Sequence, residues 1–176
     1  MKLTDVAFKA YDVRGIYPTE VNEELAYRVG RILVQKLHAK KILVGHDIRL
    51  SGPDMLKSLA EGITDAGAEV VNIGQCGTEM VYFGTYHTEA DGGVMITASH
   101  NPKEYNGYKV YWADGAQLPP QHADAIAKEL ESVDIFTGVK RMAFDDAVKA
   151  GMVEVIGEET DRKFMAHVLE MINDKE

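Results

Sequence analysis

The sequence predicts an α/β protein, a three-layer α/β/α sandwich around a mixed, mainly parallel central sheet. The first observation is that short apolar runs, typical of buried strands, alternate with stretches whose apolar residues recur at helical spacing. This βαβα rhythm is typical of a parallel sheet covered by helices. The second is an alternating segment after the third strand, which we expect to pair in the antiparallel sense and so make the sheet mixed.

The first two helices and the strand between them follow from residues 22–67. Asn22 is a good N-cap, and the apolar residues after it keep helical spacing to near His38. The apolar run 42–44 is typical of a buried strand, and a loop follows it. Pro53 suits the first turn of the next helix, which Gly67 is placed to end.

The middle of the chain continues the same alternation. A strand is expected over 69–73, followed by a helix that Thr78 caps and that runs to about His87. The next strand, 93–97, leads into a polar loop, and 107–112 alternates as the strand beside it.

The remaining segments are expected to complete the sheet and its cover. Residues 113–116 form a turn, and Pro119 and Pro120 open a helix. A short helix is expected over 145–150 and a last strand over 152–156.

We expect one domain followed by a helix. Residues 1–155 form the α/β domain, and residues 156–176 form a terminal helix leading towards a second domain that the chain lacks. The helix carries an apolar stripe made of Phe164, Val168, Leu169 and Ile172. Such a stripe also favours self-association of the chain.

Composition and charge disfavour several classes of partner. The 176 residues are 45% hydrophobic and 27% charged, with a net charge of −9 and a pI near 5.1. Nucleic acid and anionic membranes attract basic faces, so we expect neither as a partner. The single cysteine, Cys76, and the lack of an apolar leader or of a membrane-length apolar stretch favour a cytoplasmic location.

Several catalytic templates are absent from the sequence. It contains no Gly-x-Ser-x-Gly, no Gly-x-x-x-x-Gly-Lys-[Ser/Thr], no Gly-x-Gly-x-x-Gly and no His-Glu-x-x-His. Hydrolase, NTPase, dehydrogenase and metalloprotease functions are therefore disfavoured.

The segment Thr97-Ala98-Ser99-His100-Asn101-Pro102 is the most informative stretch. It follows an apolar strand, where a loop can be held rigidly at a sheet edge. Pro102 restricts Asn101 to extended or turn geometry, so the Ser99 hydroxyl is presented from a stiff turn. On these residues alone, a polar turn without chemistry is the alternative.

Three segments together resemble the α-D-phosphohexomutase family. The segment 97–102 resembles its active-site serine loop. Phe8-Lys9-Ala10-Tyr11-Asp12-Val13-Arg14-Gly15 resembles its N-terminal signature, and Asn106-Gly107-Tyr108-Lys109 resembles the strand after the serine loop. The resemblance implies the first domain of a phosphomannomutase or phosphoglucomutase, an isomerase that interconverts hexose 1-phosphate and hexose 6-phosphate.

The resemblance implies a phosphoserine mechanism. Ser99 would carry a phosphoryl group, give it to a hexose monophosphate and regain one from the hexose 1,6-bisphosphate formed, which also serves as activator. Phosphoryl transfer needs charge stabilisation, so Mg²⁺ is expected on the Ser99 phosphate. That phosphate is the metal ligand expected from this chain.

Four other residues are candidates for the site. Arg14 offers a fork of donors suited to phosphate, and Gly15 would let the backbone turn closely; a surface salt bridge is the alternative. Lys109 is expected as a general base or phosphate partner, or else as a solvated strand lysine. The resemblance makes His100 a catalytic contact and Tyr11 a wall of the substrate site, with turn shaping and core packing as their alternatives.

A supporting layer is expected behind these residues. Asp47-Ile48-Arg49-Leu50-Ser51 is similar to a family segment at the same place. Arg49 either supports the serine loop or pairs locally with Asp47, and Asn101 belongs to the loop itself.

The resemblance covers one of the family's four domains. The aspartate-rich metal loop, the sugar-recognition loop and the last phosphate-binding loop have no counterpart here. We therefore expect the remaining mutase domains as partners, a hexose phosphate as substrate and no turnover by this chain alone. The alternative is a binding or regulatory module that keeps the fold without transfer chemistry.

Overall fold

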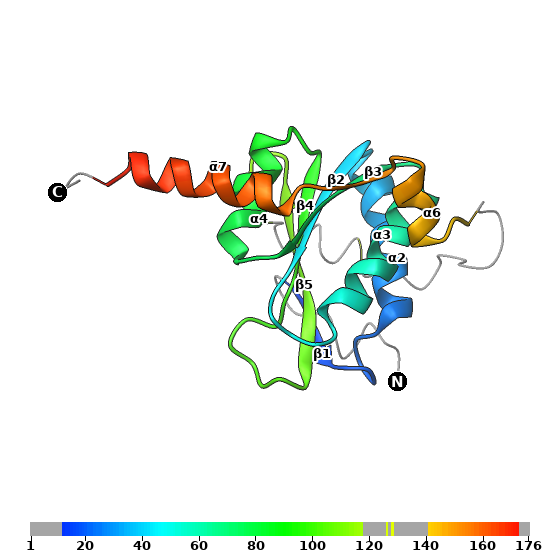
Figure 1. Cartoon of the computed structure of the whole chain (residues 1–176). Coiled ribbons are helices and arrows are strands. Elements are labelled where there is room, and N and C mark those ends of the chain that lie inside the picture. Colours follow the sequence, from blue (N-terminus) through cyan, green and yellow to red (C-terminus); the bar gives the residue numbers. More distant parts are fainter. Residues whose placement is uncertain (1–11, 118–125, 127, 129–140, 173–176) are drawn as a thin grey trace.

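A computed structural model of the chain describes residues 12–117, 126, 128 and 141–172. Its strands are β1 (Val13–Ile16), β2 (Lys41–His46), β3 (Glu69–Gln75), β4 (Gly92–Ile96), β5 (Tyr105–Trp112) and β6 (Val153–Val155). Its helices are α2 (Glu23–Leu37), α3 (Gly52–Asp65), α4 (Thr78–His87), α6 (Phe144–Lys149) and α7 (Gly157–Glu170), arranged as Figure 1 shows.

The strands form one mixed sheet in the order β1-β5-β4-β2-β3-β6. The strands β4, β2, β3 and β6 run parallel to one another, whereas β5 runs antiparallel to both β4 and β1. The predicted mixed sheet with a parallel centre is confirmed. Because β2 and β4 are parallel neighbours, the loops after them leave the sheet at the same edge.

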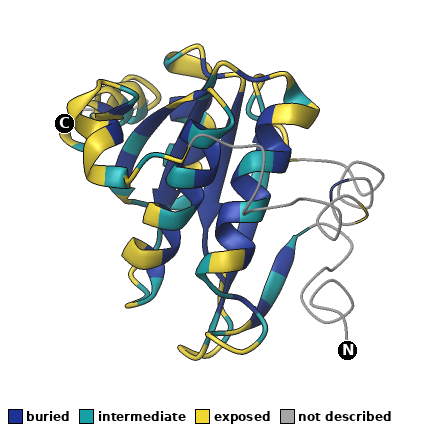
Figure 2. Ribbon diagram, turned by 90° about the vertical axis from the view of Figure 1, so that its right-hand side faces the viewer, coloured by how far each residue is buried: buried dark blue, intermediate teal, exposed yellow. Residues whose placement is uncertain are grey.

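Helices cover both faces of the sheet. Helices α2, α3 and α6 lie on one side, and α4 and α7 lie on the other (Figure 1). Each face has its own buried cluster: Ile32, Leu59 and Ile96 belong to the larger one, whereas Leu43 belongs to the smaller. Figure 2 shows the buried sheet between exposed helix surfaces, which confirms the three-layer sandwich.

Two glycines allow α2 and α3 to pack closely. A Cβ on Gly62 would lie 2.1 Å from the carbonyl oxygen of Tyr27, and one on Gly30 would lie 2.4 Å from that of Leu59. Both separations are shorter than van der Waals contact. The α2–α3 contact therefore depends on the absence of side chains at these two positions.

The ends of α2 follow the prediction, but the start of α4 does not. The Asn22 side chain accepts a hydrogen bond from Leu25 N at 3.0 Å, and His38 ends the helix in the left-handed conformation, with φ 49°. In contrast, Gly77 is the N-cap of α4, and Thr78 is already helical and makes no cap. The predicted cap at Thr78 was wrong because Gly77 supplies the extended residue before the helix.

Two further expectations are corrected by the structure. Gly15 lies in β1, a strand that the sequence did not predict, and not in a turn. A Cβ there would meet the Glu20 Cβ at 2.8 Å, so Gly15 accommodates the chain that folds back over it. Helix α7 ends at Glu170, and Ile172 N bonds to Leu169 O in a turn beyond it, so Ile172 is not part of the helical stripe. The helix predicted to open at Pro119 and Pro120 starts outside the described residues.

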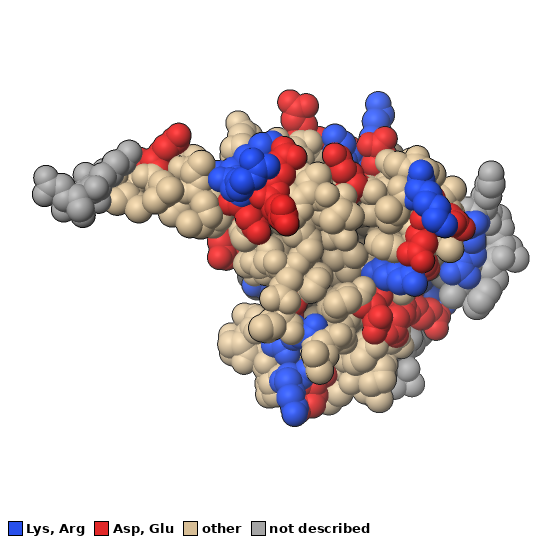
Figure 3. Space-filling view, in the orientation of Figure 1, with Lys and Arg blue, Asp and Glu red and all other residues tan. Residues whose placement is uncertain are grey.

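Helix α7 docks at its beginning and projects at its end (Figure 1). The rings of Phe164 and Phe83 meet edge to face with centroids 5.3 Å apart, and Thr160 is buried. Met165 and Leu169 are more than half exposed. Within the described residues, no helix is long and apolar enough to cross a membrane. On the face drawn in Figure 3, basic side chains mostly lie among acidic ones.

Candidate active site

The serine loop begins where β4 ends. All of β4 is buried, and so are Thr97 and Ala98, whereas Ser99 and His100 are exposed. Ser99 has φ 56°, in the left-handed region that non-glycine residues seldom adopt. Such backbone strain of roughly 1–3 kcal/mol persists where the surroundings enforce it, and it is frequent at functional sites. The Ser99 Oγ lies 3.4 Å from His100 Nδ1.

Arg49 holds the serine loop from behind. Its Nε donates to Asp47 Oδ2 at 3.1 Å. Its two terminal nitrogens donate, over 2.7–3.0 Å, to four backbone carbonyl oxygens: those of Ser99, Asn101, Pro102 and Tyr105. These five contacts match the five N–H groups of a guanidinium. Both contacts that the sequence left open for Arg49, to the loop and to Asp47, are therefore present.

Asp47 connects this arrangement to Thr97. Its Oδ1 accepts from Arg49 N at 3.0 Å, and its Oδ2 accepts from Thr97 Oγ1 at 2.7 Å. The Thr97 oxygen in turn accepts from Ser99 N at 2.9 Å. A single carboxylate therefore fixes both Arg49 and Thr97, and each of these contacts the backbone of Ser99.

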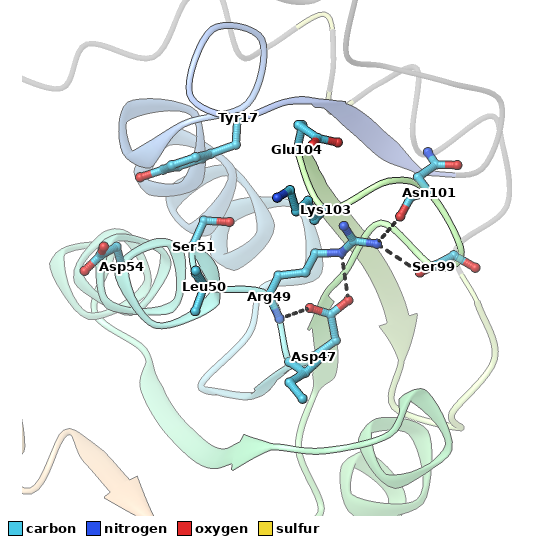
Figure 4. A pocket seen from close by; sticks show the side chains of 11 residues that line it. Tyr17, Asp47, Arg49, Leu50, Ser51, Asp54, Ser99, Asn101, Lys103 and Glu104 are labelled. Atoms are coloured by element: carbon cyan, nitrogen blue, oxygen red, sulfur yellow. Dashed lines mark hydrogen bonds and ion pairs between the residues drawn. The ribbon is translucent and has the colours of Figure 1, made fainter.

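A cavity of about 680 Å³ lies beside the serine loop. It is lined by Tyr17, Asp47, Ile48, Arg49, Leu50, Ser51, Asp54, Ser99, Asn101, Lys103 and Glu104 (Figure 4). In Figure 4 the Ser99 hydroxyl points away from the side of the cavity formed by Ser51 and Asp54. The hydroxyl is therefore presented outward, while the loop carbonyls face Arg49.

The two basic side chains of the cavity, Arg49 and Lys103, differ in whether their N–H groups are available to a ligand. All five Arg49 donors are occupied, whereas Lys103 makes no hydrogen bond or ion pair within the described residues. Tyr17 donates to Glu23, and this hydrogen bond raises the pKa of Tyr17 to about 12. Tyr17 therefore stays a neutral phenol near neutral pH.

Arg14 and Lys109 lie on the sheet next to the loop. Arg14 is opposite Gly107 in the β1–β5 pair, and Gly107 O accepts from Thr97 N at 3.0 Å. Lys109 lies two positions beyond Gly107, so the two-residue repeat of a strand puts it on the same sheet face as Arg14. Neither lines the cavity. The Arg14 guanidinium pairs with Asp12, and its buried Nε has no hydrogen-bond partner among the residues that the structure describes.

The other predicted residues are placed as follows. Asn101 lines the cavity, and its backbone carbonyl oxygen accepts a hydrogen bond from Arg49. His100 is exposed next to Ser99. Tyr11 lies outside the described residues. The sequence prediction gave no role to Thr97 or to Asn106, whose Nδ2 donates to Ser51 Oγ at 2.8 Å. Thr97 directly follows the buried strand β4 and Asn106 lies within β5, and both side chains are buried. A polar residue in or next to a strand is the signal that points to both, because buried polar groups need partners.

The described residues offer no preformed metal site. No three His, Cys, Asp or Glu side chains within the described ranges lie close enough to share an ion. Asp47, the carboxylate nearest in the network to Ser99, already accepts three hydrogen bonds.

Comparison with known sequences gives a consistent result. The family profile described as "Phosphoglucomutase/phosphomannomutase, alpha/beta/alpha domain I" matches residues 5–135. A protein named "Phosphohexose mutases" from Xanthomonas campestris pv. campestris (strain B100) is 52% identical over 108 residues, 61% of this chain and 24% of that protein. A phosphomannomutase of Escherichia coli (strain K12) is 49% identical over 109 residues, 62% of this chain and 24% of that protein.

Solved structures share the fold. A phosphoglucomutase/phosphomannomutase family protein from Burkholderia thailandensis superposes with a TM-score of 0.67 and 29% identity, over 75% of this chain and 31% of that one. A putative phosphomannomutase from Thermus thermophilus gives a TM-score of 0.65 and 29% identity, over 70% and 29%. The matched region is about a quarter of the length of the two sequence relatives. The chain belongs to the phosphoglucomutase/phosphomannomutase family and contains its α/β/α domain I.

Proposed function

We propose that this domain is the phosphoserine domain of a hexose-phosphate mutase, with Ser99 as the residue that carries the phosphoryl group. The observation that carries the proposal is the presentation of Ser99. Its hydroxyl is exposed on a loop whose backbone is held by Arg49 through four carbonyl oxygens. Phosphoryl transfer depends mainly on positioning and charge stabilisation, so a rigidly held hydroxyl is what this chemistry requires.

The proposed transfer uses one oxygen of the protein. The phosphorylated Ser99 gives its phosphoryl group to a hydroxyl of a hexose monophosphate: the bond from phosphorus to Ser99 Oγ breaks, and a bond to the sugar oxygen forms. The proton of the sugar hydroxyl passes to a base and finally to Ser99 Oγ. The product, hexose 1,6-bisphosphate, returns its other phosphoryl group to Ser99 by the reverse exchange, so hexose 1-phosphate and hexose 6-phosphate interconvert.

The proposed roles of the neighbouring residues follow from their charge and place. Arg14 and Lys109 share the sheet face beside the loop, where they would attract the phosphate groups of the substrate. His100 would exchange a proton with Ser99 Oγ, and the separation of 3.4 Å between that oxygen and His100 Nδ1 supports this role. Tyr11 is proposed as a wall of the substrate site. Asp47, Arg49 and Asn101 fix the loop and do not touch the reacting atoms.

Mg²⁺ is the proposed cofactor, and hexose 1,6-bisphosphate the proposed activator. Mg²⁺ bound to a phosphate on Ser99 would offset the negative charge that builds up during transfer. The described residues add no carboxylate cluster, so the other oxygen ligands would come from outside this domain.

The complete reaction is proposed to need the rest of a mutase. The chain matches about a quarter of the two curated relatives, so the sugar-binding and metal-binding parts would belong to further domains. We propose that residues 1–155 act as the phosphoserine domain of a cytoplasmic enzyme and that helix α7, within 156–176, contacts the next domain. The domain alone is expected to turn over no hexose phosphate.

The test is the phosphorylation state of Ser99 in the cell. The protein is purified from the cells that make it, and intact-mass and peptide mass spectrometry locate any phosphate. One phosphoryl group on Ser99, lost in Ser99→Ala but kept in the control Ser58→Ala on α3, supports the proposal. A protein without phosphate on Ser99 would favour the binding or regulatory module instead.

A further inference from the structure

Thr97 lies between the carboxylate of Asp47 and the backbone of Ser99. It follows β4 directly and is only 5% exposed. Its Oγ1 donates to Asp47 Oδ2 at 2.7 Å and accepts from Ser99 N at 2.9 Å. A hydroxyl has one hydrogen to donate and lone pairs to accept with, so both capacities are used in opposite directions.

We propose that Thr97 is a positioning residue that holds Ser99 in its left-handed conformation and thereby aims the Ser99 hydroxyl. This inference rests on the proposed function of Ser99. The φ of 56° at Ser99 is unfavourable for a residue with a Cβ, so the fold must supply an opposing interaction. The Ser99 N–H to Thr97 Oγ1 bond is such an interaction, because it links the amide of the strained residue to the end of β4.

Asp47 gives this bond its direction. An ionised carboxylate only accepts hydrogen bonds, so the Thr97 hydrogen must point to Asp47 and its lone pairs are left for Ser99 N–H. Asp47 itself is fixed by Arg49, through the backbone N–H at 3.0 Å and through Nε at 3.1 Å. Through the contacts of Arg49 with Asp47, of Asp47 with Thr97 and of Thr97 with Ser99, the loop after β2 therefore fixes the position of Ser99 in the loop after β4.

Two substitutions at position 97, to valine and to serine, distinguish the contribution of the Thr97 hydroxyl from that of the side-chain shape. Thr97→Val keeps the branched shape but removes both hydrogen bonds, which leaves the Ser99 N–H without its acceptor. Thr97→Ser keeps the hydroxyl and loses one methyl group. A role in positioning therefore predicts that serine rescues what valine loses, whereas a role in packing predicts the opposite order.

Thr85 provides a matched control. It is fully buried, and its Oγ1 donates to Val81 O at 2.7 Å within α4, away from the serine loop. Thr85→Val therefore loses a buried hydroxyl and one hydrogen bond without altering the contacts of Ser99. It corrects for any general loss of stability caused by a buried threonine-to-valine change.

The experiment has two readouts. The first is the hydrogen exchange rate of the Ser99 amide, measured by NMR in the chain, which should rise about tenfold in Thr97→Val and stay near the wild-type value in Thr97→Ser and Thr85→Val. The second is the phosphate occupancy of Ser99 in protein purified from cells. It should fall at least severalfold in Thr97→Val alone.

The outcomes distinguish a failure of the positioning role of Thr97 from a failure of the proposed function of Ser99. An unchanged Ser99 amide and unchanged occupancy in Thr97→Val would overturn the positioning role. A Ser99 amide that responds as expected while no variant carries phosphate would overturn the proposed function and leave the contact intact. If Thr97→Val fails to fold, the wild-type chain decides: Ser99 N–H must exchange more slowly than His100 N–H, which has no partner in the described structure, and equal rates contradict the inference.

Discussion

A terminal nitrogen of the Arg49 guanidinium donates a hydrogen bond to the carbonyl oxygen of Ser99 at 3.0 Å, across 50 positions of the chain. The contact joins the loop after β2 to the loop after β4. It is possible because these strands are parallel neighbours, with His46 opposite Ile96 at their ends and Asp47 N bonded to Ile96 O. The serine loop is therefore held by the neighbouring loop as well as by its own strand.

Replacing Arg49 with lysine should loosen the serine loop while keeping the charge. An ammonium has three N–H groups and no planar fork, so at least two of the five acceptors of Arg49, the four loop carbonyls and Asp47, lose their donor. We expect the free energy of unfolding in urea to fall by about 2 kcal/mol. Arg28→Lys is the matched control, because Arg28 pairs with Glu24 on the surface of α2 and should cost less than about 0.5 kcal/mol. Equal losses in the two variants would contradict the clamp.

Replacing Gly62 with alanine should destabilise the α2–α3 contact. In an exposed helix this change usually stabilises, since alanine is the better helix former by about 1 kcal/mol. Here the added Cβ would lie 2.1 Å from the Tyr27 carbonyl oxygen, and backbone must move. We expect a net loss of about 2 kcal/mol in urea unfolding, whereas Lys57→Ala on the exposed side of α3 should change little. A more stable Gly62→Ala protein would show that the helices can separate at low cost.

Most of the fold could be predicted because its signals are local. Helical spacing after Asn22 and the apolar run at 42–44 each report one element, and the structure has α2 and β2 there. Strand β1 was missed because it is four residues long and mixes buried with exposed positions. Such a short strand forms because it pairs with β5, and the sequence pattern of residues 13–16 does not reveal this pairing.

The sequence named Ser99, Asp47, Arg49 and Asn101, which line the cavity, but it did not give their contacts. The resemblance pointed to Ser99, Arg49 and Asp47, yet two contacts of Arg49 remained as alternatives. Their coexistence depends on β2 lying next to β4, a strand order that periodicity cannot give. Thr97 was part of the motif without a role, because its two partners come from different loops.

Tyr27 should make stability depend on alkaline pH. Burial, followed by its hydrogen bond to Asp65 at 2.6 Å, raises the pKa of Tyr27 from 10.0 to about 12. The folded state therefore favours the neutral phenol: its contribution is complete below about pH 10 and is lost as the pH rises towards 12. The stability difference between the wild type and Tyr27→Phe should shrink over this window.

The measurement for Tyr27 is urea unfolding at a series of pH values, with the exposed Tyr86→Phe as control. Other tyrosines with raised pKa values, such as Tyr111, leave a pH dependence in every variant, so the informative quantity is the difference from the wild type. A difference for Tyr27→Phe that stays constant between pH 10 and 12 would refute the coupling.

Cys76 should be a slow nucleophile in the folded chain. Burial raises the pKa of its thiol from 9.0 to about 12, and its Sγ lies 2.5 Å from where a Cβ on Gly45 would be, so it is packed against β2. The thiolate is the reactive form, and a shift of this size lowers its fraction at pH 8 by roughly a thousandfold. Disulfide exchange with an aromatic disulfide reagent should therefore be at least about a hundredfold slower in the native chain than in urea.

The same shift fixes the sign of the effect of pH on Cys76. Because the folded pKa is raised, the protonated thiol stabilises the fold fully below about pH 9, and this contribution disappears as the pH approaches 12. As the pH rises through this window, the reaction rate of Cys76 in the native chain should therefore increase more steeply than its rate in the unfolded chain. Cys76→Ser supplies the blank for both rates. Fast, complete reaction of the native chain at pH 8 would mean that the thiol is accessible and ionised, and that β2 does not cover it as described.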